Sequence, residues 1–230
     1  MAKFGIVVIN HERRMVLELF LASIERLRAL AGDFPVVCVS GEEDKRMCER
    51  ANVIHLSRAN KPVTEKWNKG FRYLHNECNV EYGMIVGSDD IISSALMQNL
   101  IDAMEKDYDL IGIRQIYFYG ASGQHRGKLI HISRPHMLGV CRTIHARVLD
   151  KIDWKPFPKR LNSSMDGLCM RTIKPFVRSQ ICVEGMCTDV KTNHNLNRME
   201  FWVNKVKERT PPKLFYDYLS EKELSLLKKL

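Results

Sequence analysis

Apolar runs of strand length alternate with stretches of helical periodicity through the first 115 residues. This alternation is typical of a sheet whose strands are joined by crossover helices. Strands are expected at residues 4–9, 35–39, 53–56, 82–87 and 110–113, and helices at about 17–32, 43–50, 63–74 and 94–106. The sequence therefore predicts an α/β fold in which a mixed, mainly parallel sheet is flanked by helices.

The second half of the chain has a weaker pattern. Residues 115–174 are rich in Arg, His and Gly, and we expect loops and a small antiparallel piece there. A helix is expected from residue 199 to about 206, ending before Pro211. Ser220 and Glu223 have the spacing of a capping box, which predicts a last helix. A chain of 230 residues suffices for one substantial core, so we expect one domain with appendages.

Charge and cysteine content indicate the cellular setting. A net charge of +9 favours either a polyanionic partner or general solubility. Seven cysteines, an odd number without paired zinc spacing, indicate free thiols in a reducing compartment, with a Cys182–Cys187 disulfide as the minority alternative. Apolar runs are too short for a membrane span, and the first strand lacks a signal-peptide cleavage site. We therefore expect a cytoplasmic protein without a transmembrane segment.

Two adjacent carboxylates, Asp89 and Asp90, follow Ser88 at the end of the apolar run 82–87. In open α/β sheets, ligands gather at the carboxyl ends of strands. Neighbouring carboxylates repel one another unless a cation offsets the repulsion, and Mg²⁺ or Mn²⁺ shared with a diphosphate would do so. The alternative is a structural role, as N-cap and first-turn acid of the helix that begins near Ser94. The pair alone leaves both interpretations open.

Four segments, in this order along the chain, resemble the GT-A glycosyltransferases, especially the family 2-like inverting enzymes. Residues 7–13 (VVINHER) are similar to the strand and loop that hold the nucleotide base and ribose, and residues 66–70 (KWNKG) to a helix that faces the donor. Residues 85–90 (IVGSDD) are similar to the strand that ends in a D-x-D-type motif, and residues 164–166 (SMD) stand where the family places its catalytic base. The resemblance implies a GT-A (Rossmann-like) fold with a helical C-terminal appendage.

The same resemblance implies a nucleotide-sugar donor, with a UDP-sugar favoured, and a set of residues that contact it. This donor-binding set comprises Val8, Asn10, Glu12, Lys66, Asn68, Ser88 and Asp89. Asp90 is the expected direct ligand of Mn²⁺ or Mg²⁺, and Asp89 would contact the ribose or reach the metal through water. Asp166 would remove the proton from the acceptor hydroxyl, with a helix N-cap as the structural alternative.

A further metal ligand is expected near the end of the catalytic region. Asp189 and His194 are both available, and a neutral imidazole would favour Mn²⁺ over Mg²⁺. A solvated role for His194 is the alternative, and Lys191 could reach a phosphate instead.

The resemblance also implies a division of the chain and a reaction type. Residues 1–195 would form the GT-A domain, with 1–115 binding the nucleotide sugar and 116–195 binding the acceptor, and 196–230 would form a basic helical segment. The Q-x-x-R-W motif of processive synthases is absent, so we expect one sugar per event.

Several acceptors and two other classes of function stay open. The acceptor candidates are a hydroxymethyl pyrimidine in DNA, which would make this an enzyme of viral or phage type acting in the host cytoplasm, a lipid-linked or surface glycan, and a protein side chain. A nucleotidyltransferase is an alternative, although residues 4–14 lack its Gly-rich phosphate loop. A non-catalytic basic module that binds nucleic acid or, through residues 197–209, a membrane surface would explain the charge but not the acidic residues.

Overall fold

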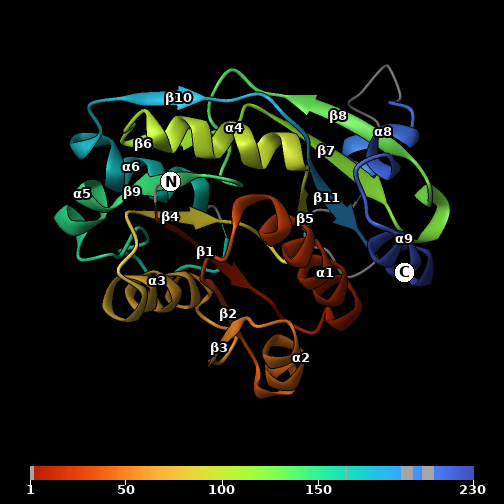
Figure 1. Ribbon diagram of the computed structural model, residues 1–230, viewed down its shortest axis with the longest axis horizontal. Helices are drawn as coiled ribbons and strands as arrows, with labels where there is room; N and C mark the ends of the chain where they lie inside the picture. The colour runs from red at the N-terminus through yellow and green to blue at the C-terminus, as the bar shows by residue number, and fades with distance from the viewer. Residues whose placement is uncertain (1–2, 164, 193–198, 204–209) are drawn as a thin grey trace.

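A computed structural model gives the fold of the chain and describes residues 3–163, 165–192, 199–203 and 210–230. Its larger sheet has seven strands in the order β10-β6-β9-β4-β1-β2-β3 (Figure 1). These strands are β1 (Phe4–Ile9), β2 (Val36–Ser40), β3 (Ile54–Ser57), β4 (Tyr82–Ile85), β6 (Leu110–Gly112), β9 (Thr143–His145) and β10 (Gln180–Cys182). Only β9 runs antiparallel to its neighbours within this sheet as described. The predicted mixed, mainly parallel sheet is therefore confirmed.

The central strands are apolar without alternation because helices cover both faces of the sheet. Successive residues of β1 point to opposite faces, so that Ile6 and Val8 pack into one core cluster and Val7 into another. The first cluster is closed by α1 (Arg14–Ala31) and α4 (Ser94–Glu105), and the second by α3 (Val63–Tyr73), α5 (Ala146–Leu149) and α6 (Met165–Ile173). The short α2 (Lys45–Arg50) connects β2 to β3.

A second sheet of four strands lies beside the first, in the order β5-β11-β7-β8. Its members are β5 (Asp90–Ile92), β7 (Gln115–Gly120), β8 (Leu129–Ser133) and β11 (Cys187–Lys191). The antiparallel β7–β8 pair is the small antiparallel piece that the sequence predicts. The sequence pattern does not reveal β5, which has three residues, or β11.

The C-terminal part of the chain contributes α7 (Met199–Val203), α8 (Lys213–Tyr216) and α9 (Glu221–Lys229). The predicted capping box of Ser220 and Glu223 is present at the start of α9. Helix α9 lies along α1 (Figure 1), where the fully buried carboxylate of Glu223 accepts hydrogen bonds from Arg26 Nε at 2.9 Å and Nη2 at 3.1 Å. None of the helices among the described residues is both long enough and apolar enough to cross a membrane. All seven cysteines are free, so the Cys182–Cys187 disulfide is not formed.

Glu223→Gln tests how strongly α9 is fixed to α1. The substitution leaves the largely buried Arg26 guanidinium, whose side chain is 14% exposed, without its carboxylate. Breaking a buried pair typically costs about 3–5 kcal/mol. For a chain of this size we expect the melting temperature to fall by roughly 6–20 °C in calorimetry. The matched control is Lys222→Gln, which breaks the exposed Lys222–Glu25 pair between the same two helices and should change the melting temperature by at most about 4 °C. Equal losses in the two variants would contradict this account.

Candidate active site

The carboxyl ends of β1 and β4 form one edge of the parallel sheet. Their register pairs Val7 with Ile85, and the Val86 N–H donates to the carbonyl of Val7 at 3.1 Å. The segments that follow the two strands therefore lie side by side. Ser88 Oγ donates to Asn10 Oδ1 at 3.0 Å, so two residues of the predicted donor-binding set are in direct contact.

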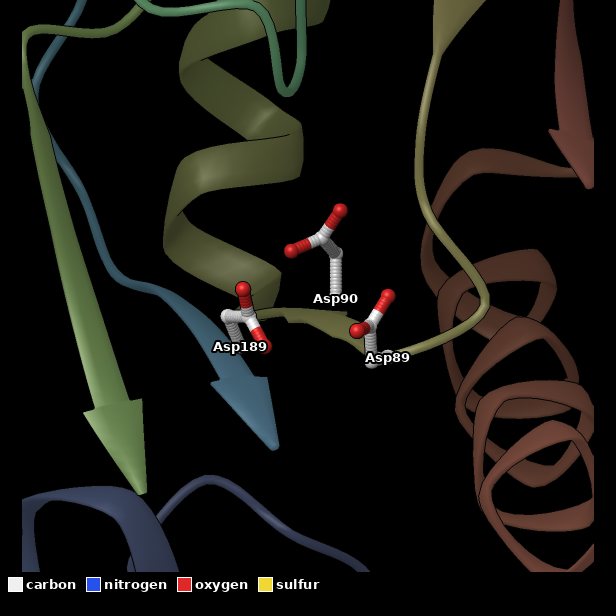
Figure 2. A group of neighbouring side chains, drawn as sticks. All are labelled: Asp89, Asp90 and Asp189. Atoms are coloured by element: carbon white, nitrogen blue, oxygen red, sulfur yellow. The ribbon is translucent and has the colours of Figure 1, made fainter. Parts of the chain in front are cut away.

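Three carboxylates meet where the chain passes from the first sheet to the second (Figure 2). Asp90 opens β5, and the antiparallel β5–β11 register places Asp189 directly opposite it. Asp89, Asp90 and Asp189 each offer a carboxylate oxygen, and these atoms lie within 4.8 Å of one another. Asp189 thus joins the cluster as the further acidic group, while His194, the other candidate ligand, lies outside the described residues.

The structural alternative for Asp89 and Asp90 is wrong. The N-cap of α4 is Ser93, whose side chain accepts a hydrogen bond from the Leu96 N–H at 3.2 Å, and the first turn of α4 holds no acidic residue. Asp90 instead accepts from the Gly87 N–H at 2.7 Å, which fixes its carboxylate within the 87–90 turn. The two acids therefore belong to the cluster and not to the helix.

Two cations contact the cluster. Arg13 bridges the neighbouring residues, with Nη1 donating to Asp89 Oδ2 at 2.5 Å and Nη2 to Ser88 Oγ at 3.0 Å. Lys191 Nζ donates to Asp189 Oδ2 at 2.5 Å. The other oxygen, Asp189 Oδ1, is buried and has no hydrogen-bond partner among the residues that the structure describes. A buried acceptor of this kind fits a cation as a ligand.

The ionisation of the cluster follows from its burial and from its two cations. Burial, Asp189 and Asp89 together hold the pKa of Asp90 well above its usual value. Burial also raises the pKa of Asp189 to about 6, although the nearby Lys191 opposes the shift. Burial acts in the same direction on Asp89, but the attraction of Arg13 and Lys191 is stronger and keeps the pKa of Asp89 below its usual value. Two positive charges therefore face three carboxylates, of which Asp90 is the hardest to ionise.

A second buried polar group lies beside the cluster, at the ends of β1 and β2. Lys66, on α3, donates from Nζ to the Asn10 carbonyl at 2.5 Å, and Asn10 Nδ2 donates to Asp44 Oδ2 at 2.8 Å. All three residues are at most 2% exposed. Burial lowers the pKa of Lys66 to about 8. Asn10, Lys66 and Ser88 of the predicted donor-binding set are thus brought together.

The other predicted donor contacts lie differently. Val8 is fully buried in the core cluster on the α1 side, so its side chain is not available to a ligand. Asn68 uses its amide on Phe157, donating to the carbonyl at 2.8 Å and accepting from the N–H at 3.2 Å. Glu12 is exposed, and its carboxylate lies 3.7 Å from the imidazole of His11. The unbroken apolar run of β1, typical of a strand covered on both faces, could have identified Val8 as a core residue.

Asp166 is exposed in the first turn of α6. Its carboxylate lies directly against Gly139, where any side chain would overlap it. Its backbone carbonyl accepts from Arg142 Nη1 at 3.2 Å, and the backbone of Arg142 in turn pairs with Ile85 at the end of β4. One short segment, residues 139–142, therefore connects Asp166 to the strand that leads into the acidic cluster.

Comparisons with known proteins extend this description. No protein-family model and no curated protein matches the chain. TarS 1–349 from S. aureus, solved in complex with UDP-GlcNAc, superposes with a TM-score of 0.62 at 15% identity over 84% of this chain. The fold is of the GT-A glycosyltransferase type. This chain spans 60% of that TarS fragment, so the likeness concerns part of TarS only.

Two further solved structures share this architecture. The 4-diphosphocytidyl-2C-methyl-D-erythritol synthase from Anaerococcus prevotii superposes with a TM-score of 0.52 at 11% identity, covering 80% of this chain and 87% of its own. The bifunctional IspDF from Campylobacter jejuni gives a TM-score of 0.50 at 14% identity, over 91% of this chain and 56% of its own. At such identities the likeness shows the fold, and the chemistry must be argued from the site.

Asp90→Asn tests the electrostatics of the cluster in the presence of EDTA. Because the pKa of Asp90 is higher in the folded than in the unfolded chain, its ionisation opposes folding, and the penalty grows as the pH rises from about 4 through the folded pKa. At pH 8 we expect the melting temperature of the variant to exceed that of the wild type, by roughly 2–4 °C for each kcal/mol of repulsion that is removed. The difference in melting temperature should become smaller as the pH falls toward 4. Calorimetry at both pH values measures it, with the exposed Asp153→Asn as control. A variant that melts at or below the wild type at pH 8 would contradict the assignment.

Proposed function

We propose that this chain is a metal-dependent, inverting glycosyltransferase that moves one sugar from a nucleotide-sugar donor, a UDP-sugar by preference, to an acceptor hydroxyl. The observation that carries the proposal is the cluster of Asp89, Asp90 and Asp189 at the carboxyl end of β4, in a GT-A fold. The TarS structure with UDP-GlcNAc bound supports a nucleotide sugar as the donor.

The cluster fits a divalent cation. Its oxygens lie within 4.8 Å of one another, Asp189 Oδ1 is a buried acceptor without a partner among the described residues, and carboxylates are the ligands that Mg²⁺ and Mn²⁺ prefer. Asp90 and Asp189 would be the direct ligands, and Asp89, which is held by Arg13, would complete the charge around the ion. When bound, the ion would neutralise the charge that collects on the departing diphosphate.

The protein side chains would divide the remaining tasks between them. Arg13 and Lys191 place positive charge beside the cluster, where it favours a diphosphate group. Asn10 is buried and hydrogen-bonded to Asp44, Lys66 and Ser88, so it would act by fixing the loop after β1 beside the nucleoside. Asp166 would accept the proton of the acceptor hydroxyl as that oxygen attacks the anomeric carbon from the face opposite the leaving group, which inverts the configuration.

The acceptor is the finer part of the proposal. A hydroxymethyl pyrimidine in DNA fits the net charge of +9, and a lipid-linked or surface glycan fits a transferase of this fold equally well. Binding to DNA would weaken steeply as salt increases, because counterions are released from phosphates on binding. Binding that does not respond to salt, or no binding, would leave the glycan as the acceptor to pursue.

Nucleotidyl transfer is the second candidate, because the cytidyl-type synthase from Anaerococcus prevotii shares the fold. The segment after β1 argues against it, since its residues Asn10–Arg13 contain no glycine and cannot form a Gly-rich phosphate loop. Gly5, the one glycine in the sequence of residues 4–14, lies inside β1 against Leu74. The products distinguish the two functions: sugar transfer releases a nucleoside diphosphate, whereas nucleotidyl transfer releases pyrophosphate.

Thermal shift with nucleotide sugars tests donor binding. With Mn²⁺ present, a donor at 100 times its Kd stabilises the protein by about 2.7 kcal/mol, which corresponds to a rise of roughly 5–11 °C in melting temperature. We expect this rise with UDP-GlcNAc or another UDP-sugar, and its loss in Asp90→Asn or when EDTA replaces Mn²⁺. CTP serves as the comparison ligand. Stabilisation by CTP alone, with release of pyrophosphate, would favour the second candidate.

Asp166→Asn tests the base. The acceptor is unidentified, so we use water as the acceptor and measure UDP released from UDP-GlcNAc in Mn²⁺. General-base catalysis contributes about 10²–10⁴-fold, and we expect a loss of that order with an unchanged thermal shift by the donor. Gly139→Ala should act in the same direction, because the added methyl group displaces the Asp166 carboxylate. The exposed Asp153→Asn is the control, and full turnover by Asp166→Asn would exclude it as the base.

A further inference from the structure

Arg142 is a buried charged residue that has no role in the proposed function. The residue is 1% exposed and ranks first by volume among the fully buried side chains of the described part of the protein. Its Nη1 donates to the Asp166 carbonyl at 3.2 Å, and its Nε is buried without a hydrogen-bond partner among the described residues. None of the ion pairs found between described residues includes Arg142.

A buried cation without a carboxylate is costly to a fold. Desolvation penalises the charge, and contacts with a neutral carbonyl and with the Cys169 thiol compensate only part of that penalty. A methionine is shorter, but it would fill much of the same space without a charge. The guanidinium is therefore poorly explained by stability and requires another reason.

The position of Arg142 supplies that reason. Its backbone carbonyl accepts from the Ile85 N–H at 2.9 Å, and the Cys141 N–H donates to the Ile85 carbonyl at 2.8 Å, so the segment is fixed to the last residue of β4. Two residues after Ile85, Gly87 begins the turn that holds Asp90. The side chain of Arg142 extends the other way, to the first turn of α6 that carries Asp166.

The residues around the guanidinium indicate that Arg142 fixes the N-terminal turn of α6 in place. Cys169, one turn further along the helix, is fully buried, and burial raises the pKa of its thiol while the adjacent Arg142 charge opposes the shift. At the other end of the same segment, Gly139 leaves the space that the Asp166 carboxylate occupies. Residues 139–142 therefore determine where Asp166 stands relative to the acidic cluster.

We propose that Arg142 is a positioning residue that holds Asp166 at a fixed place relative to Asp89 and Asp90, and that its buried charge serves transfer and not stability. The proposal rests on the proposed function, because it takes Asp166 as the base. Arg142 itself touches neither donor nor acceptor. It acts by joining, through one side chain and two backbone hydrogen bonds, the two elements on which the base and the cluster lie.

Arg142→Met is the principal test, with Arg142→Lys as the variant that keeps the charge. For Arg142→Met we expect a melting temperature at or above that of the wild type, a KM for UDP-GlcNAc within about threefold, and a kcat for UDP release at least about tenfold lower, since small displacements of a catalytic group cost rate more than binding. Arg142→Lys should recover part of the lost kcat. In the Asp166→Asn background, Arg142→Met should lower kcat no further, because it acts through Asp166.

Each contrary result overturns the proposal in a recognisable way. A melting temperature and kcat that fall together would show a structural role, and an equal loss of kcat with and without Asp166 would show that Arg142 acts elsewhere. If Arg142→Met does not fold, the same cycle with Arg142→Lys decides between these outcomes.

Hydrogen exchange gives a readout that does not depend on turnover. In Arg142→Met, amides of α6 should exchange at least about threefold faster while those of β1 and β2 stay unchanged. Unchanged exchange in α6 would overturn the positioning role even if the protein releases UDP normally. Faster exchange in α6 in a protein that releases no UDP from any nucleotide sugar would leave the positioning of residue 166 established and refute the proposed function instead.

Discussion

The mutual repulsion of Asp89, Asp90 and Asp189 is the constraint on which the rest of the site depends. Arg13 and Lys191 supply two positive charges at hydrogen-bond distance, and the third carboxylate is left without a matching cation among the described side chains. Burial and the two neighbouring carboxylates raise the pKa of Asp90, so the protonated form of its side chain is favoured over the ionised form. A divalent ion would neutralise the excess negative charge more fully than a proton on Asp90, because it carries two positive charges instead of one. The cluster is thus a site where stability and ion binding oppose each other, as is expected of a functional site.

Both sheets must form before this cluster exists. Asp89 ends the turn that leaves the larger sheet, Asp90 begins β5 of the smaller sheet, and Asp189 arrives from β11 through a single antiparallel register. A shift of one residue in that register would turn Asp189 to the opposite face. Two hydrogen bonds that flank the pair support this register: the Val190 N–H donates to the Asp89 carbonyl at 2.8 Å, and the Met186 N–H donates to the Ser93 hydroxyl at 3.3 Å. The chemistry therefore depends on strands that are individually too short to be stable alone.

The sequence predicts the helices and strands that have a regular apolar pattern. It does not predict the short strands that form only because they pair with distant strands. Strands β1 to β4 and helices α1, α3 and α4 have strong apolar patterns, and the capping box at Ser220 is read directly from its spacing. Strands β5 and β11 are three and five residues long, and their partners, not their residues, make them strands. Ser88–Asp90 could be found from one strand end, whereas the contact of Asp189 with it spans about 100 residues and depends on the second sheet. Arg13 gives no periodic signal, since it is one polar residue in a loop that contacts Asp89 only after folding.

The buried charged side chains of this protein are of two kinds: those that are paired and stabilise the fold, and those at the candidate site that are not fully paired. Glu223 and Arg26 form a complete pair between α1 and α9, with both partners hydrogen-bonded, which is how a fold uses charge for a contact that must hold. Lys66, Asp90 and Arg142 are buried to a similar degree, yet none of them is matched in this way among the described residues. All three lie on the segments that converge at the carboxyl ends of β1 and β4, and each contacts backbone that carries a neighbouring site residue. The buried charges at this edge of the sheet are only partly compensated, whereas the Arg26–Glu223 pair is compensated fully. A site that binds a charged ligand needs such uncompensated charge, because the ligand then lowers the free energy by pairing with it.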